Sequence, residues 1–273
     1  MNQYPNLPPH VIDIWYAHVD TLIASDSVGN HFKILSGSEK EQIGKFALLR
    51  VREESLAARL LVRHALSFYA EITPERWQFT KGERGKPFVQ APWKGFSAFN
   101  LTHSANLVVC AVAAEGQLGV DVESLDRSTT GVPLARRFFA PQEVEQLIAL
   151  PPAMRPEAFL QIWTLKEAYI KATGDGMAMP LDQFFFDLTV SGPAQLHLKD
   201  PSDSGSNWLF AQVRLPSRHH ISLGMTNRTI AERGEKSQVI VRARELRSPY
   251  AAVPDAVVVC LEKNAWFFKP ESK

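Results

Sequence analysis

The order of the predicted elements most constrains how this chain can fold, because a long helical pattern followed by short apolar strands occurs twice. Residues 54–70 place Leu56, Leu60, Leu61 and Leu66 toward a core, and residues 156–173 form a second long helical pattern. The predicted strands that follow are residues 77–80, 96–101 and 107–113 in the first half, and 184–190, 208–213 and 220–225 in the second. The repeated order predicts two similar α+β halves.

Glycine and proline mark the expected boundaries. A Gly-rich step at 115–119 separates the two patterns, so we divide the chain into an N-terminal half, a C-terminal half and an extension without an assigned role, at residues 1–117, 118–230 and 231–273. Pro156 suits the first turn of the second long helix, and Gly174 the position just past its end. Other predictions are strands at 11–19 and 119–123, helices at 38–49 and after Pro141, and a surface loop at 192–207.

Composition and charge exclude several classes of protein. Thirty Lys+Arg residues against twenty-nine Asp+Glu leave a net charge of +1, so no global field attracts nucleic acid or an anionic membrane. Cys110 and Cys260 lie in apolar, β-branched surroundings without metal-ligand spacing, which predicts buried reduced thiols. There is no basic-then-apolar leader, and no apolar run approaches the ~20 residues that cross a bilayer. We therefore expect a soluble, cytoplasmic protein that binds neither nucleic acid nor membrane.

The first stretch that carries chemistry is GVDVE at residues 119–123. On a strand, Asp121 and Glu123 point to one face while Val120 and Val122 point to the other. Two carboxylates thereby converge and could bind a metal ion. For this pentapeptide alone, a solvated acidic face of an edge strand is the better explanation of the pattern.

The second stretch is WTLKEAYIK at residues 163–171. In a helix, Trp163, Glu167 and Lys171 are four residues apart and share one side, so an acid and a base lie next to an aromatic side chain. An ordinary Glu-to-Lys pair on an amphipathic surface helix would show the same spacing. Neither stretch decides the function by itself.

The third stretch is FNLTHS at residues 99–104, a polar cluster beside a predicted buried strand, preceded by GKP at 85–87. Such clusters form ligand sites, although Asn, Thr and Ser also make local turn hydrogen bonds and most turn lysines are merely solvated. Taken together, three carboxylates, two lysines and a histidine are what Mg²⁺-dependent transfer from a pyrophosphate requires. The conjunction favours that chemistry.

At this point the sequence resembles the 4′-phosphopantetheinyl transferase family, in its larger, two-halved type that activates surfactin synthetase. GVDVE and WTLKEAYIK are similar to the two signature motifs of that family and occur in the expected order, and GKP, FNLTHS and RRFFAPQEVEQL (136–147) fit its pattern around them. The resemblance implies an α+β fold with two pseudo-symmetric halves, each a small, mainly antiparallel sheet packed with helices. It also implies transfer of 4′-phosphopantetheine from coenzyme A to a serine of an apo acyl or peptidyl carrier protein, in fatty-acid, polyketide or nonribosomal-peptide synthesis.

The resemblance assigns roles to individual residues. Asp121, Glu123 and Glu167 would bind Mg²⁺ or Mn²⁺, and Glu167 would also take the proton of the carrier serine. Lys171 would neutralise charge on the departing adenosine 3′,5′-bisphosphate. Contacts with coenzyme A would come from Arg52, Lys86, Thr102, His103, Lys166 and Lys171. Arg52 has an alternative as part of a solvated helix face shared with Arg59 and Arg63.

Other interpretations remain open. The same carboxylates could activate water, which would make the protein a Mg²⁺-dependent pyrophosphate hydrolase acting on coenzyme A or nucleotides. A third interpretation is an inactive protein that has the transferase fold and only binds the carrier, although none of the signature side chains is missing. A serine hydrolase, a P-loop protein and a dinucleotide-binding protein are disfavoured because the GxSxG, Walker A and GxGxxG patterns do not occur. One chain contains both halves of the expected cleft, which predicts a monomer.

Overall fold

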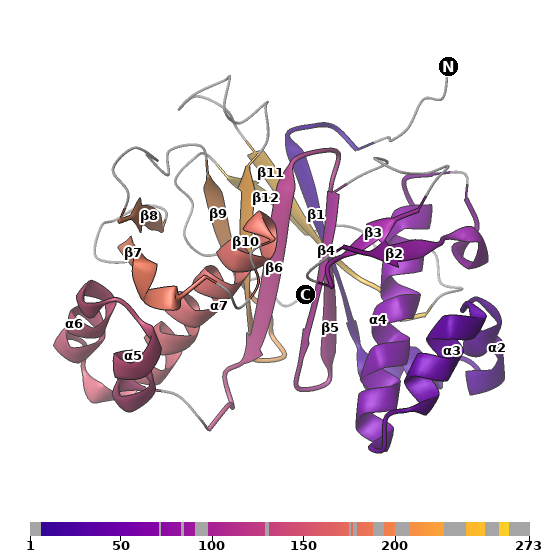
Figure 1. Ribbon diagram of the computed structural model, residues 1–273, viewed down its shortest axis with the longest axis horizontal. Coiled ribbons are helices and arrows are strands. Elements are labelled where there is room, and N and C mark those ends of the chain that lie inside the picture. Colours follow the sequence, from indigo (N-terminus) through magenta and orange to yellow (C-terminus); the bar gives the residue numbers. More distant parts are fainter. Residues whose placement is uncertain are drawn as a thin grey trace. The chain divides into compact units, whose positions relative to one another are not determined.

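A computed structural model describes most of the chain, and its residues form two compact units. The described residues are 7–70, 72–82, 85–90, 98–128, 131–174, 176, 179–187, 194–199, 208–226, 239–248 and 257–261. Unit 1 comprises residues 1–115 and 240–258, and unit 2 comprises residues 116–239 and 259–273. Each unit is an α+β structure, which confirms the predicted fold class (Figure 1).

Unit 1 is built around a five-stranded sheet with the order β12-β11-β1-β5-β4. Its strands are β1 (Val11–His18), β4 (Ala98–Ser104), β5 (Leu107–Ala113), β11 (Val239–Glu245) and β12 (Val257–Leu261), with a separate hairpin of β2 (Phe79–Lys81) and β3 (Pro87–Val89). Its helices are α1 (Val19–Ala24), α2 (Val28–Lys33), α3 (Gly37–Gly44), α4 (Leu49–Ser67) and the short η1 (Pro74–Arg76). The β1-β5 and β5-β4 pairs are antiparallel, and β11 runs parallel to β1.

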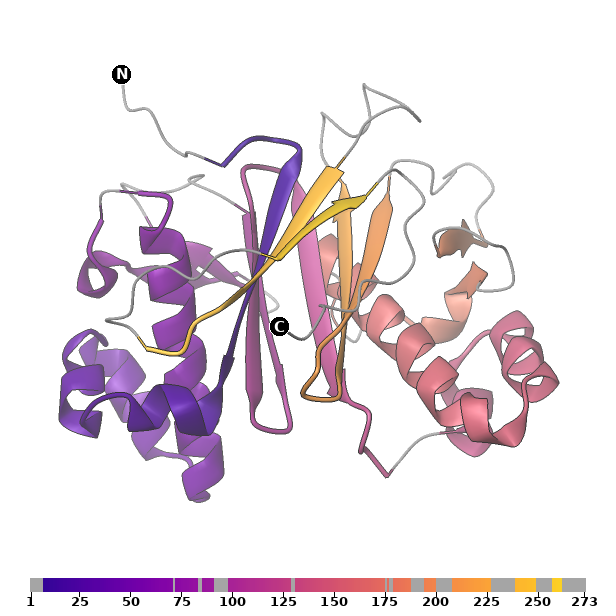
Figure 2. The same ribbon diagram turned by 180° about the vertical axis from the view of Figure 1, so that it is seen from behind.

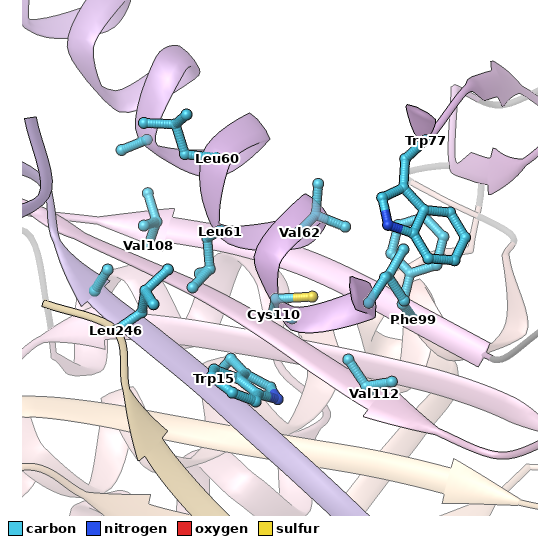
Figure 3. Packing of buried hydrophobic residues seen from close by; sticks show 14 of the residues in the cluster. Trp15, Leu60, Leu61, Val62, Trp77, Phe99, Val108, Cys110, Val112 and Leu246 are labelled. Atoms are coloured by element: carbon cyan, nitrogen blue, oxygen red, sulfur yellow. The ribbon is translucent and has the colours of Figure 1, made fainter. Parts of the chain in front are cut away.

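The core of unit 1 lies between α4 and one face of this sheet. Leucines at helical spacing on α4, such as Leu60 and Leu61, meet alternate side chains of β5, such as Val108 and Cys110 (Figure 3). All of these are fully buried, and Cys110 is a free thiol, as the sequence predicts. Cys260 lies in β12, whose side chains are not described. Burial of aliphatic surface therefore holds α4 on the sheet.

The C-terminal extension contributes a strand to unit 1, which the sequence did not assign. β11 runs alongside β1, in register from Val11 opposite Ile240, and the two are neighbours in Figure 2. The Arg242 guanidinium donates to both oxygens of the fully buried Asp13, at 2.5 and 2.7 Å. Tyr69 donates its hydroxyl to the same carboxylate. A buried carboxylate thus finds its counter-charge on a strand more than two hundred residues away in sequence.

Unit 2 has a three-stranded antiparallel sheet with the order β6-β10-β9, next to which a small hairpin and a helical layer are built. Its strands are β6 (Gln117–Ser124), β7 (Phe184–Asp187), β8 (Gln195–Leu198), β9 (Leu209–Arg214) and β10 (His219–Thr226). Its helices are α5 (Val132–Phe138), α6 (Pro141–Ala149), α7 (Arg155–Thr173) and the short η2 (Pro152–Met154) and η4 (Leu181–Gln183). As predicted, Pro156 lies in the first turn of α7 and Gly174 caps its end with φ of 80°.

Several predicted boundaries differ from the structure. The helix predicted over 38–49 ends at Gly44, and Leu49 instead begins α4. The loop predicted over 192–207 contains β8, because its short Leu-His-Leu run pairs with β7. α1, α2 and α5 were not predicted, and residues 188–190 of one predicted strand lie outside the described residues. Among the described helices, none combines the length and the apolar character that a membrane crossing requires.

Candidate active site

The two signature stretches meet where α7 lies on β6. Gly119 allows this approach, because a Cβ built there would lie 2.0 Å from the Ala168 backbone oxygen of α7. Figure 1 shows α7 beside β6 and β10 within unit 2. The close approach brings the half-buried side of α7, which carries Trp163, Glu167 and Lys171, toward the acidic residues of β6.

Each acid of β6 forms an ion pair with a nearby cation. The Lys171 ammonium lies 2.6 Å from Asp121 Oδ1, and the side chain of Asp121 is only 8% exposed. Glu123 forms an ion pair with Arg127, which follows four residues later, and Arg127 also stacks over the Trp163 ring at 5.5 Å. Sequence reasoning missed Arg127, although a base four residues after an acid at the end of a strand could have suggested it.

Glu167 completes the acidic cluster. Burial raises the pKa of its carboxyl, and the negative charges of Asp121 and Glu123 raise it further, while Lys171 and Arg127 lower it. The three predicted metal-binding acids are therefore close enough to feel one another's charge. Within the described part of the chain, no three His, Cys, Asp or Glu side chains already stand in a metal-binding arrangement. Their donor chemistry nevertheless fits a hard divalent cation.

Lys166 points away from this cluster, unlike its neighbour Glu167. It is fully buried, with its ammonium 2.8 Å from Glu143 Oε2 of α6 and 2.6 Å from the carbonyl oxygens of Leu181 and Phe184. Glu143 is equally buried and also accepts the Phe186 backbone N–H at 2.9 Å. A fully buried ammonium with three hydrogen-bond partners has no exposed face for a phosphate, so the structure gives Lys166 a structural role in place of the predicted phosphate contact.

The residues predicted to bind coenzyme A from the first half all lie in unit 1, but they do not share one surface. Thr102 is buried on β4, whereas His103 is exposed and lies 3.8 Å from Glu54 of α4. Successive residues of a strand face opposite sides, so the two side chains leave β4 on different faces, and their contact with coenzyme A stays a prediction. Arg52 is exposed at the start of α4, where its guanidinium donates to the Phe46 carbonyl. Burial lowers the pKa of Lys86, which is half-buried beside β3.

A cavity of about 460 Å³ opens in unit 1 between α3, α4 and the β2-β3 hairpin. Its walls include the rings of Trp77, Phe79 and Phe99 and two arginines of α4, Arg59 and Arg63. Gly85 and Pro87, which flank Lys86, also line it, whereas Arg52 is not among the described residues that do. The alternative considered for Arg52 placed Arg59 and Arg63 on the same solvated helix face, and the structure excludes this for both of them because they are more than four-fifths buried.

Comparison of the sequence with known proteins places the chain in a family. A model described as "4′-phosphopantetheinyl transferase, N-terminal" matches residues 25–115, and one for the 4′-phosphopantetheinyl transferase superfamily matches residues 117–223. The 4′-phosphopantetheinyl transferase HetI of Nostoc sp. is 38% identical over 59% of this chain and 68% of its own length. The chain belongs to the 4′-phosphopantetheinyl transferase family. Membership confirms the predicted enzyme class, a transferase of the phosphopantetheine arm.

Other members of the family agree with this assignment. A putative 4′-phosphopantetheinyl transferase of Synechocystis sp. is 36% identical over 64% of this chain and 70% of its own length. The 4′-phosphopantetheinyl transferase Sfp of Bacillus subtilis is 26% identical over 68% of this chain and 81% of its own length. These relatives carry transferase names, and nothing among them supports the hydrolase alternative. In this transferase the β6–α7 cluster falls within the superfamily match, and the cavity of unit 1 falls within the N-terminal match.

Proposed function

We propose that this transferase moves 4′-phosphopantetheine from coenzyme A to a serine of an apo acyl or peptidyl carrier protein, in a reaction that requires Mg²⁺ or Mn²⁺. The observation that carries the proposal is the meeting of Glu167 on α7 with Asp121 and Glu123 on β6. Three carboxylates from two elements offer the hard oxygen ligands that these ions prefer. The pyrophosphate of coenzyme A is an additional source of oxygen ligands.

The ion pairs in the cluster support this assignment. Asp121 and Glu123 each already attract a cation, namely Lys171 and Arg127. A divalent ion held by the same acids would replace these cations as the counter-charge and leave both side chains able to meet phosphate oxygens. The bound ion would neutralise charge on the diphosphate during transfer.

The side chains of unit 2 would then perform the proton and charge transfers. Glu167 accepts the proton of the carrier serine, whose oxygen forms a bond to the phosphorus that carries pantetheine. The bond from this phosphorus to the bridging oxygen of the pyrophosphate breaks, and adenosine 3′,5′-bisphosphate departs. Lys171 neutralises the charge that builds on that leaving group. Positioning and charge stabilisation make up most of what the protein contributes in such transfers.

We assign the nucleotide end of coenzyme A to the cavity of unit 1. Aromatic walls suit a purine ring, and Arg59 and Arg63 supply positive charge for a phosphate. The position of Gly85 and Pro87 in its lining supports the predicted contribution of Lys86. Both arginines pair with Glu39, but Arg59 is the better candidate for a direct phosphate contact, because it is 19% exposed and 3.7 Å from this acid, whereas Arg63 is 1% exposed and 2.7 Å from it.

The wider setting of the reaction is part of the same proposal. We expect fatty-acid, polyketide or peptide-synthetase carriers as acceptors, a cytoplasmic location and a monomeric enzyme. The sequence resemblance supports the carriers, and the presence of both family regions in one chain supports the monomer.

Intact-mass analysis of an apo carrier after incubation with coenzyme A, Mg²⁺ and the enzyme tests the proposal. Glu167→Gln should lower kcat by roughly 10²- to 10⁴-fold, because it removes both the base and one metal ligand. Glu157→Gln is the matched control, since Glu157 is a half-buried acid of the same helix that pairs with Arg214 outside the cluster. Arg59→Gln should instead raise KM for coenzyme A more than KM for dephospho-coenzyme A.

The outcomes separate the parts of the proposal. Full activity in the presence of excess EDTA would rule out the metal requirement, and near-normal kcat in Glu167→Gln would rule out the role of this acid. Cleavage of coenzyme A at the same rate without any carrier would indicate hydrolysis. An unchanged KM for coenzyme A in Arg59→Gln would rule out the assignment of the nucleotide to the cavity of unit 1.

A further inference from the structure

The sheet face that supports α7 in unit 2 is polar where a core would normally be apolar. Asp121, Ser222 and Gln212 lie side by side across β6, β10 and β9, because Ser222 is in register with both of the others. All three residues are buried. Directly paired residues of antiparallel strands face the same side of a sheet, so this row points toward α7. The acid of the proposed metal site is one end of a continuous polar row.

Thr164 of α7 joins the middle of this row. Its hydroxyl lies 2.6 Å from Ser222 Oγ, and it is also 2.8 Å from the Leu160 carbonyl oxygen of the previous helical turn. Gln212 Nε2 lies 3.2 Å from Ser222 Oγ and 3.2 Å from the Gln161 carbonyl oxygen. Both strands β9 and β10 therefore hold α7 through hydrogen bonds in the interior of the unit.

The Leu160 carbonyl fixes the direction of the hydrogen bond between Thr164 and Ser222. The Leu160 carbonyl only accepts, so Thr164 donates to it and must accept from Ser222. The amide nitrogen of Gln212 has two protons and three groups within reach, namely Ser222 Oγ, the Gln161 carbonyl oxygen and, at 2.9 Å, His220 Nε2. Every hydroxyl in the chain has a partner for its proton, and such networks select one arrangement because any displacement leaves a buried group unpaired.

The network connects α7, which carries Glu167, to β10, the sheet neighbour of the strand that carries Asp121 and Glu123. Ser222 is the register partner of Asp121 on β6, and Thr164 is one helical turn before Glu167 on α7. A slide or rotation of α7 over β10 would break the hydroxyl contact and would move Glu167 away from Asp121 at the same time. Gly119 and Gly224 add to this arrangement, since they leave room for the Ala168 backbone on the other side of Glu167.

We propose that Thr164, Ser222 and Gln212 are positioning residues that set the rotation and height of α7, so that Glu167 joins Asp121 and Glu123 around the divalent ion. The inference rests on the proposed metal site but concerns residues that touch neither ion nor substrate. Loss of groups that orient metal ligands typically weakens metal binding by roughly 10- to 100-fold. We expect a change of this size when the hydroxyl of Thr164 is removed without change of shape.

Titration of the enzyme–coenzyme A complex with Mn²⁺, followed by the EPR signal of the unbound ion, tests this without turnover. Coenzyme A alone gives the background that is subtracted. Thr164→Val should raise the dissociation constant for Mn²⁺ by roughly 10-fold or more, whereas Thr164→Ser should keep it within about twofold. Ile162→Val is the matched control: it also changes a buried side chain of α7, but this side chain lies in an apolar cluster away from the row. Circular dichroism and Tm establish that all variants are folded at the temperature of titration.

Comparison of Mn²⁺ binding by the wild type and the variants distinguishes a missing metal site from a missing positioning role. If the wild-type complex binds no more Mn²⁺ than coenzyme A alone, the metal site itself is absent and the positioning role falls with it. If the wild type binds and Thr164→Val binds equally well, the metal site stands and the positioning role is overturned. A weakening in Ile162→Val as large as that in Thr164→Val would likewise overturn it, because general loss of stability would then explain both. Rescue by Thr164→Ser supports the role of the hydroxyl.

Discussion

The two long helices, α4 in unit 1 and α7 in unit 2, have the same length of 19 residues but rest on different surfaces. α4 packs mainly leucines against Val108, Cys110 and Val112 of β5. α7 instead lies over two glycines and a row of buried polar residues on β6, β10 and β9. One surface stabilises the unit, and the other brings chemical groups together.

Both helices nevertheless use a buried cation to attach the short helix that precedes them. On α4, Arg63 pairs with Glu39 of α3 at 2.7 Å, and on α7, Lys166 pairs with Glu143 of α6 at 2.8 Å. Glu39 retains 18% exposure beside the cavity, whereas Glu143 retains none. The ion pair of unit 1 is therefore accessible to solvent, whereas that of unit 2 is fully buried, and the loss of stability on removing the cation should differ between them.

The largest expected effect on stability comes from removing the buried ion pair between Lys166 and Glu143. Lys166→Met leaves Glu143 buried without its cation, which should lower the free energy of unfolding by about 3–5 kcal/mol. Arg63→Met should cost less, about 1.5–3 kcal/mol, because water can reach Glu39. Urea unfolding of both variants measures the difference. Lys166→Met with Glu143→Gln should recover part of the loss, and an equal or larger cost for Arg63→Met would contradict this contrast.

The second effect concerns the glycines under α7, which have no counterpart on β5. Gly119→Ala would place a Cβ 2.0 Å from a backbone oxygen of α7, so the helix must move, at a cost of about 3 kcal/mol or more. Movement of α7 also displaces Glu167, so kcat should fall. At Gly224 the nearest atom, 2.9 Å away, belongs to the Phe210 ring, which can turn, and Gly224→Ala should cost only about 1 kcal/mol. Equal unfolding free energies and activities in the two variants would show that close approach at Gly119 is not required.

The sequence predicted much of the difference between the surfaces under α4 and α7, because the alternation of side chains on a strand and their spacing on a helix are local properties. Alternation on β6 placed Asp121 and Glu123 on one face, and the four-residue spacing placed Glu167 and Lys171 on one side of α7. Local patterns also predicted both ends of β5 correctly, since a short, unbroken apolar run between two turns is typical of a buried strand. Here the physical rules act between residues that are neighbours in the chain.

What the sequence did not predict depends on contacts between distant segments. Lys166 and Glu167 are adjacent, and only the packing of α6 and β7 decides that Lys166 is enclosed while Glu167 faces β6. The pairing of Arg242 with Asp13, the cavity around Arg59 and the hydroxyl of Thr164 on Ser222 likewise join residues far apart in sequence. No local period signals such pairs.

The smallest effect is the pH dependence that His64 gives to α4. Burial lowers the pKa of His64 to about 4, with the charges of His31 and Arg63 lowering it further and Glu75 raising it, and its Nε2 is buried without a hydrogen bond. An unfolded histidine titrates near ~6.5, so below that pH the unfolded chain binds a proton that the folded one refuses. This contribution to stability is complete above pH ~6.5 and is lost as the pH falls toward 4, by about 1 kcal/mol between pH 7 and 5.5.

His64→Gln should abolish this part of the dependence of stability on pH. Hydrogen exchange resolved by peptide is the suitable measurement, because α4 should lose protection at low pH in the wild type more than in the variant, while α7 should respond equally in both. If α4 loses the same protection in both proteins, the buried histidine does not explain the acid sensitivity of unit 1.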